Sequence, residues 1–176
     1  MLAYDLAQIL PSDFAPDSRA WIYQSSRSFS EKETAEIDEQ LLQFYLQWQS
    51  HGAEVKGWAK LLFGQFVVVL ADEEATGVSG CSTDSMVRVV KSLERQYSVN
   101  FFDRLTLTFL VEGKAQMLPL NQVGYALEKG FISADTPFFN NTISTKAELE
   151  SGWLQPLQHS WLWSRLKRNT AGAKNG

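Results

Sequence analysis

The stretch Phe66-Val67-Val68-Val69-Leu70-Ala71 decides the fold, because it is a continuous apolar run bounded by turn-forming residues. Gly64 lies just before it and Asp72 follows it directly. A short, uninterrupted apolar run that is rich in β-branched residues is typical of a fully buried strand. We therefore predict a strand that is buried on both faces or lies at the centre of a sheet.

The segment before this strand carries the clearest helix signal in the chain. Ser30 and Glu33 have the spacing of a capping box, in which each side chain accepts a hydrogen bond from the other residue's backbone N–H. After them, we expect the helix to end at His51-Gly52, because glycine suits the left-handed position beyond a helix. The apolar positions between these ends recur with a helical period, at Ile37, Leu41, Phe44, Tyr45 and Trp48.

Strand patterns and a second helix surround these two elements. We expect strands at residues 20–27, 55–62 and 105–111, and a second helix from about Thr83 to Tyr97. The order of elements is then β-α-β-β-α-β. This order predicts an α+β fold with a ferredoxin-like core, in which two helices cover one face of an antiparallel sheet.

The rest of the chain adds a hairpin and C-terminal helices to this core. Glu112-Gly113 is a tight-turn signal that closes the hairpin. Helical patterns follow, and the last of them covers residues 157–166, beyond Pro156. We expect one α+β domain over residues 1–166 and a disordered polar tail over residues 167–176.

Composition and charge limit the classes of function. The chain has 176 residues, 44% of them hydrophobic, and a net charge of −4. Duplex-binding domains carry a basic excess, so nucleic-acid binding is not expected. The longest apolar run, residues 66–71, is too short to span a membrane, and the start of the chain around Asp5 lacks the basic character of a secretory signal. We therefore expect a cytoplasmic protein that binds neither nucleic acid nor membrane.

Disulfide and metal chemistry are equally restricted. Cys81 is the only cysteine of the sequence, so an intramolecular disulfide is impossible. The two histidines, His51 and His159, are too few for a histidine-rich metal site without the help of several carboxylates. We expect neither a metal ion nor a cofactor.

The segment after the apolar strand gives the strongest indication of a functional site. It leads into a helix start, where unpaired N–H groups and the helix dipole favour anions and lower the pKa of a nearby thiol. Cys81 is the candidate catalytic residue there. Hydroxyl groups and cations follow it, and we predict a ligand site formed by Ser82, Thr83, Asp84, Ser85, Arg88 and Lys91.

A purely structural interpretation of the same segment stays open. In that interpretation Ser82 or Thr83 is the N-cap of the helix, and Asp84 is stabilised by the dipole in the first turn. Asp84 then also forms an i,i+4 ion pair with Arg88. Cys81 becomes a small buried apolar residue, as free cysteines often are.

Two other features bear on function. His51 is either a general base that pairs with Cys81 or a partner of the preceding helix dipole. Trp161 and Trp163 are two residues apart in the last helical pattern, so they cannot face the same way. One of them is therefore exposed or covered by a second chain, which suggests a homodimer through the C-terminal helices.

Two phosphate-binding motifs are missing from the sequence. A cysteine phosphatase loop has one residue fewer between its cysteine and its arginine than the six that separate Cys81 from Arg88. A P-loop has Gly-Lys followed by Ser or Thr after a glycine-rich turn, and no such run occurs. The chain therefore lacks the standard apparatus for nucleotide hydrolysis.

Six strings together resemble a known family because they occur in the same order. They are WIYQSSRSFS (21–30), SHGAEVKGWAKL (50–61), VVLADEEATGVSGCSTDSMVRVVKSLE (68–94), VNFFDRL (99–105), FFNNTISTKAELESGWLQP (138–156) and HSWLWSRL (159–166). The chain is similar to a small bacterial cytoplasmic family whose members are often labelled "ABC transporter ATPase". Because the P-loop is missing, the resemblance does not imply a true ABC ATPase.

These observations favour a binding role over an enzymatic one. We expect a binding or regulatory domain that takes a small anionic ligand or a protein partner near residues 80–91. One alternative is a thiol-dependent enzyme or redox sensor that uses Cys81. The other alternative is a homo-oligomeric interaction module.

Overall fold

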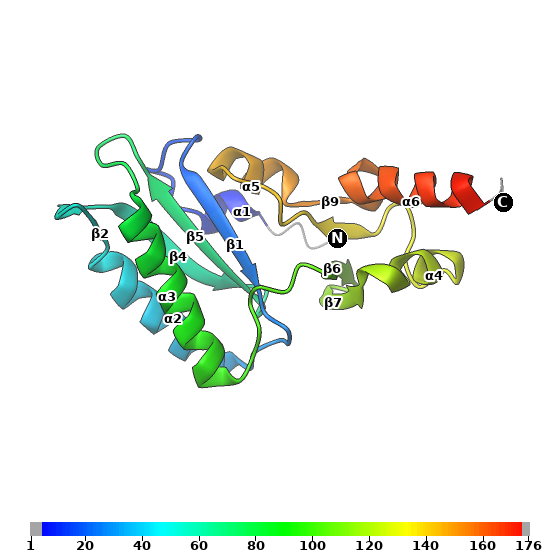
Figure 1. The fold of residues 1–176 in the computed structure, drawn as a ribbon, viewed down its shortest axis with the longest axis horizontal. Helices are drawn as coiled ribbons and strands as arrows, with labels where there is room; N and C mark the ends of the chain where they lie inside the picture. Colours follow the sequence, from blue (N-terminus) through cyan, green and yellow to red (C-terminus); the bar gives the residue numbers. More distant parts are fainter. Residues whose placement is uncertain (1–4, 174–176) are drawn as a thin grey trace. The chain divides into compact units, whose positions relative to one another are not determined.

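A computed structural model describes the backbone of residues 5–173 and the side chains up to residue 169 (Figure 1). Within these residues the chain forms two compact units. The first unit comprises the chain up to Asp103 together with Asn141–Ser151, and the second comprises Arg104–Asn140 together with the chain from Gly152 onward. The chain therefore passes between the units more than once, unlike two domains joined by one linker. One domain over residues 1–166 stays a prediction.

The first unit is built on a three-stranded antiparallel sheet. Its strands are β1 (Arg19–Gln24), β4 (Lys56–Leu62) and β5 (Phe66–Asp72), in the order β1-β5-β4. Val69 pairs with Trp21 of β1 on one side and with Ala59 of β4 on the other. Every residue of β5 is buried, so the prediction of a central, fully buried strand is confirmed.

Two helices cover one face of this sheet (Figure 1). They are α2 (Glu31–Leu46) and α3 (Gly80–Tyr97), and the predicted capping box at the start of α2 is formed. Apolar residues recur on one side of each helix, and this side packs against the sheet. The core of this face is formed mainly by Ile37, Leu41, Val67, Val69, Ala71, Met86, Val90 and Leu93.

The end of α2 differs from the prediction. The helix stops at Leu46, and His51-Gly52 instead forms the turn of a short hairpin between β2 (Gln49–Ser50) and β3 (Ala53–Glu54). Both turn residues have positive φ, 52° for His51 and 80° for Gly52. Two-residue hairpins with a type I′ turn require this left-handed backbone at both central positions. The prediction of a left-handed backbone at Gly52 is therefore correct, but this backbone belongs to a hairpin turn and not to a helix end.

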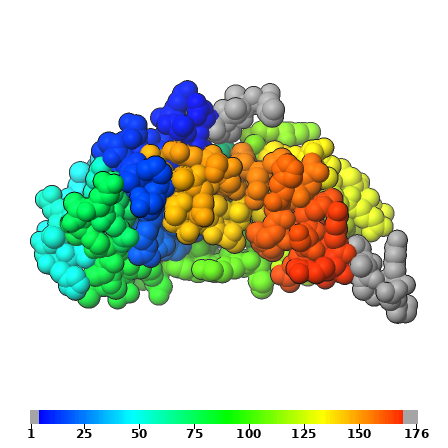
Figure 2. All heavy atoms as spheres, turned by 90° about the horizontal axis from the view of Figure 1, so that it is seen from above, coloured from blue at the N-terminus to red at the C-terminus, as the bar shows by residue number. Residues whose placement is uncertain are grey.

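The N-terminal arm and α5 (Lys146–Gly152) also belong to the first unit, and they lie side by side in the space-filling view (Figure 2). The arm contains the short helix α1 (Leu6–Ile9), on the opposite side of the sheet from α3 (Figure 1). Backbone N–H groups of Lys146 and Ala147 donate to carbonyls of the arm, at 2.8 and 2.9 Å. The buried ammonium of Lys146 donates to the carbonyl of Phe14 at 3.0 Å. These bonds fix the arm to α5.

The second unit contains a four-stranded antiparallel sheet. Its strands are β6 (Thr106–Val111), β7 (Lys114–Pro119), β8 (Pro137–Phe139) and β9 (Leu154–Pro156), in the order β7-β6-β8-β9. The predicted hairpin is β6 and β7, with Glu112 and Gly113 at positive φ in its turn. The unit has its own core, which is formed by Phe109, Val123, Ala126, Ile132, Phe138, Leu157 and Leu162.

In the second unit, each of two helices comes after a strand along the chain, with a short 3-10 turn between them. The 3-10 turn η1 (Leu120–Gln122) leads into α4 (Val123–Glu128), and a second turn, η2 (Leu157–His159), precedes α6 (Trp161–Ala173). Helix α6 continues into the segment 167–176, which the sequence predicts as a disordered tail. Residues 174–176 lie outside the described residues.

The α+β class is confirmed, because helices and antiparallel sheets are both present. A ferredoxin-like core is not confirmed. In that core the fourth strand of the predicted order lies beside the first, whereas β6 pairs with β7 and β8 in a different sheet from β1. Three of the predicted strands nonetheless have the order expected of such a core. In the described part of the chain, no helix has the length and apolarity that a membrane crossing needs.

Gly57 of β4 gives a direct test of the packing between the sheet and Trp48, which follows α2. A Cβ atom at this position would lie 2.6 Å from Cε3 of Trp48, whose ring is buried and hydrogen-bonded. We expect Gly57→Ala to lower the free energy of unfolding by about 1–3 kcal/mol, as overpacking does. Urea unfolding followed by tryptophan fluorescence measures this change.

The matched control is Gly77→Ala in the same unit, where no atom lies within 4 Å of the added Cβ. We expect this variant to be unchanged or stabilised by less than about 1 kcal/mol. Equal stability of Gly57→Ala and wild type would contradict the described packing around Trp48.

Asp72 predicts a dependence of stability on pH. Its carboxylate is buried, which opposes ionisation, but N–H groups of Ala15 and Glu74 and the ammonium of Lys56 donate to it. The net effect is a pKa below the ordinary aspartate value of 3.8. Stability from this carboxylate is therefore present above that value and is lost as pH falls through the lower pKa of the folded protein.

The variant Asp72→Asn isolates this contribution. We expect it to be less stable than wild type at pH 7, and we expect the difference to shrink as pH falls below about 4, because protonation then removes the same charge. Urea unfolding at a series of pH values measures both curves. If the stability difference between wild type and Asp72→Asn stays constant down to pH 2, the charge of the Asp72 carboxylate does not stabilise the fold.

Candidate functional site

The predicted site lies at the start of α3, directly after β5 and a loop. The N-cap is Ser79, rather than Ser82 or Thr83 as predicted. Ser79 Oγ accepts from the N–H of Ser82 at 3.2 Å, and Ser82 Oγ accepts from the N–H of Ser79 at 2.8 Å. The helix thus starts at Gly80, three residues before the predicted start, because a Ser-x-x-Ser pair closes the capping box and places glycine in the first turn.

The hydroxyl groups of the predicted site are used inside the helix. Thr83 Oγ1 donates to the carbonyl of Ser79 at 2.9 Å, and Ser85 Oγ donates to the carbonyl of Cys81 at 3.0 Å. Ser82 is fully buried, and its hydroxyl also donates to the carbonyl of Ser79. The three hydroxyls therefore do not form a set of donors directed at a ligand.

Cys81 is exposed, so the interpretation of it as a buried apolar residue is wrong. It is the second residue of α3, where a backbone N–H has no partner within the helix. Its thiol makes no hydrogen bond with a described residue. His51 lies in the turn of the β2–β3 hairpin, and no hydrogen bond joins it to Cys81. The geometry therefore offers a thiol open to solvent but no described base that would activate it.

Three exposed cations follow along α3. Arg88 and Lys91 were predicted as site residues, and Arg95 was not; the helical period places all three on the face that carries Cys81. None of the three forms an ion pair with a residue in the described part of the chain. Asp84 is also exposed there, and the predicted ion pair between Asp84 and Arg88 is not formed. The exposed face of α3 carries more positive than negative charge.

A buried hydrogen bond fixes the start of α3 against the rest of the first unit. The indole Nε1 of Trp48 donates to the carbonyl of Ser82 at 2.9 Å. Trp48 also packs edge-on against Trp21 of β1, with ring centroids 6.2 Å apart, and its ring is tilted against that of Phe44 of α2, with centroids 5.0 Å apart. The first turn of α3 therefore has a fixed position relative to the sheet and to α2.

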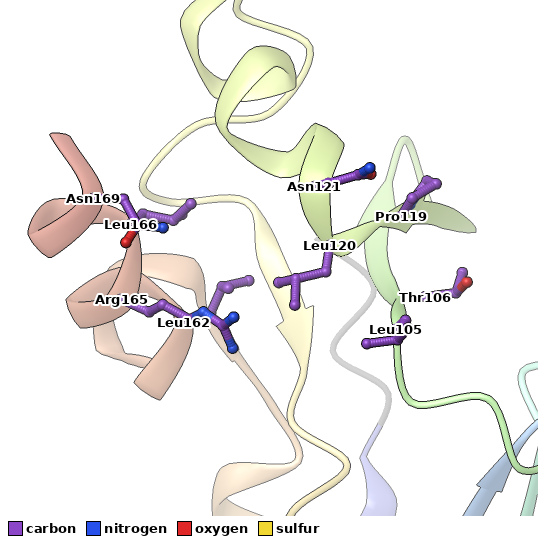
Figure 3. A pocket seen from close by; sticks show the side chains of 9 residues that line it. All are labelled: Leu105, Thr106, Pro119, Leu120, Asn121, Leu162, Arg165, Leu166 and Asn169. Carbon is purple, nitrogen blue, oxygen red and sulfur yellow. The ribbon is translucent and has the colours of Figure 1, made fainter. Parts of the chain in front are cut away.

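A pocket in the second unit was not predicted from the sequence (Figure 3). It has a volume of about 550 Å³ and lies between α6 and the segment where β6, β7 and η1 meet. Its lining residues are Leu105, Thr106, Pro119, Leu120, Asn121, Leu162, Arg165, Leu166 and Asn169. The spacing of Leu162, Arg165, Leu166 and Asn169 shows a shared helical face in the sequence, but no sequence signal shows what lies opposite.

Trp161 and Trp163 differ in exposure, as their spacing in the sequence predicts. Trp161 is 40% exposed and makes an edge contact with Phe138, whereas Trp163 packs partly against the core of the second unit. Trp153 is fully buried. One tryptophan of the pair is therefore exposed, and a homodimer through this surface stays a prediction.

Among the described residues, no three side chains of His, Cys, Asp or Glu gather where they could hold a metal ion. Comparison of the chain with models of known families, with curated proteins and with solved structures gives no match. The resemblance to the bacterial family therefore stays a prediction, and the functional argument depends on the described geometry.

The position of the N-cap gives a test of the local structure at this site. We expect Ser79→Ala to lower the free energy of unfolding by about 0.5–2 kcal/mol, because it removes the hydroxyl that accepts from Ser82 N–H. The control is Ser85→Ala, whose partly exposed hydroxyl bonds only within the helix, and we expect a change below about 0.5 kcal/mol. Urea unfolding measures both. A larger loss at Ser85 than at Ser79 would contradict the assigned cap.

Proposed function

We propose that the chain is a cytoplasmic binding domain that takes an acidic segment of a protein partner along the exposed face of α3. The observation that carries this proposal is the group formed by Arg88, Lys91 and Arg95, three exposed cations that have no ion pair among the described residues. The sequence as a whole has a net charge of −4, so unneutralised cations on one face are not explained by a general basic excess. An exposed free thiol at Cys81 also suits a reducing compartment.

The spacing of these cations favours an extended partner over a small ion. Residues advance by 1.5 Å along a helix axis, so Arg88 and Arg95 are separated by roughly 10 Å. A single small anion contacts one or two of these side chains, whereas an acidic segment contacts all three. The engagement of the Ser82, Thr83 and Ser85 hydroxyls within the helix also argues against a closed cradle for a small ion.

The rigidity of the face supports a role in recognition. Its opposite side contributes Met86, Val90 and Leu93 to the core, and the bond from Trp48 to Ser82 fixes its first turn. Less freedom is then lost when a partner binds, because the helix is already held in place. The attraction is electrostatic, so we expect the affinity to fall as salt rises.

Charge reversal on α3 tests the proposal. The probe is a fluorescent poly-L-glutamate peptide of about twenty residues, with binding measured by anisotropy at low and at physiological salt, and the full chain is used. We expect the triple variant Arg88→Glu, Lys91→Glu, Arg95→Glu to weaken binding at least tenfold, because attraction becomes repulsion over the whole face. Circular dichroism checks that the variant is folded.

The matched control reverses three exposed cations elsewhere, namely Lys60→Glu, Lys114→Glu and Arg168→Glu, and therefore changes the net charge equally. We expect it to retain most of the binding. Equal loss in both triple variants would show that net charge alone attracts the peptide and would reject the α3 face. Binding of inorganic phosphate that Arg88→Gln abolishes, without binding of the peptide, would favour the small-anion alternative.

The thiol and oligomer alternatives lack a comparable observation. Cys81 is exposed, but no described acid or base is hydrogen-bonded to its thiol, so a thiol-dependent activity stays a prediction. A homo-oligomeric module also stays a prediction, based on the exposed side of Trp161.

A further inference from the structure

We infer that the pocket of the second unit binds a small acid with an apolar body, such as a medium-chain carboxylate. This inference is independent of the proposed role of α3, because every lining residue of the pocket belongs to the second unit. Three properties of the pocket carry it: its apolar walls, one cation at its edge, and a size suited to a small molecule.

The walls of the pocket are mostly aliphatic. Leu162 and Leu166 come from α6, and Leu105 and Leu120 lie across the pocket from them (Figure 3). Leu105 is 69% exposed, so a large apolar side chain at the mouth of the pocket is in contact with solvent. Removing apolar surface of this kind from water is favourable. An aliphatic chain or ring therefore gains free energy by entering the pocket.

Arg165 gives the pocket its charge. Its side chain extends from α6 toward Leu162 and the space in front of Leu120 (Figure 3). It forms no ion pair or hydrogen bond with a residue in the described range, and none of the lining residues is acidic. A guanidinium matches a carboxylate with two parallel hydrogen bonds, and it stays charged at all physiological pH values. The preferred ligand is therefore an anion.

Two amide side chains extend the polar edge of the pocket. Asn121 and Asn169 line it from η1 and α6, and neither side chain is hydrogen-bonded to another described residue. Asn169 is one helical turn from Arg165 on α6, so its amide can add a hydrogen bond to a carboxylate beside Arg165, whereas the side chain of Asn121 points away from Arg165 (Figure 3). The polar groups and the leucines are thus arranged as in small-molecule sites, where a few polar groups fix the orientation of a mainly apolar ligand.

The volume favours a small molecule over a protein segment. A cavity of about 550 Å³ falls within the range of roughly 300–1,000 Å³ that is typical of ligand pockets. A helix with its side chains is roughly 10–12 Å across and rises about 5.4 Å per turn, so about one turn would already fill this volume. A second copy of the chain is therefore a less suitable occupant, and the experiment below includes it as an outcome.

The test uses the full chain and three probes: octanoate, which has both chain and charge; 1-octanol, which has the chain alone; and acetate, which has the charge alone. Binding is followed by changes in amide NMR signals on titration. We expect saturable octanoate binding that shifts signals of β6, η1 and α6, and much weaker binding of the other two probes. We expect Arg165→Gln to weaken octanoate binding at least tenfold, because it removes a charge-assisted pair.

The matched control is Arg168→Gln, which removes an exposed cation of the same helix that does not line the pocket. We expect this variant to bind octanoate as tightly as wild type does. We expect the same of Arg88→Gln, which changes a cation on α3. Equal binding of octanoate and 1-octanol, or equal loss in both α6 variants, would overturn the inference, as would the absence of saturable binding. Light scattering and NMR also test a second copy of the chain as the occupant. A dimer that octanoate does not dissociate, together with shifts of the same NMR signals as protein concentration rises, would overturn the inference and assign the pocket to a second copy.

Discussion

The complete burial of β5 is the constraint on which the rest of the first unit depends. All seven residues of this strand are buried, and its neighbours β1 and β4 occupy both of its edges. One face is covered by α2 and α3, while α1 lies on the other side of the sheet (Figure 1). A strand without exposed surface has no alternative face, so a shift by one residue would still bury apolar side chains. A polar pair at the end of the strand matches the observed register, because Asp72 lies opposite Lys56 of β4 and its carboxylate accepts a hydrogen bond from the Lys56 ammonium at 3.4 Å.

The same constraint places the candidate site. The chain leaves β5 at Asp72, and α3 must return across the sheet to cover Val67, Val69 and Ala71. The buried face of α3 therefore determines which residues remain outside, and these include Cys81, Arg88, Lys91 and Arg95. The bond from Trp48 to Ser82 then fixes the first turn of the helix. The set of residues exposed on this surface is a consequence of packing on the opposite one.

The sequence was most informative where a pattern is local. The apolar run of β5 and the capping box at Ser30 each follow from neighbours within a few residues, and both are present. It failed where a local signal has two uses: His51-Gly52 suits a helix end and a hairpin equally, and serine caps a helix from several positions. The strand at 105–111 was found, but alternation does not reveal a strand's partner, and β6 pairs outside the first sheet. The pocket was missed for the same reason, since its two walls come from residues about fifty positions apart along the chain.

Amide hydrogen exchange, measured residue by residue on the native protein, tests the central role of β5 most directly. The account predicts that the amides of residues 67–71 exchange more slowly than any others in the first unit, and only through global unfolding of that unit. Exchange of these amides before those of α2 and α3 would contradict it, because the strand would then open while its covering helices stayed folded.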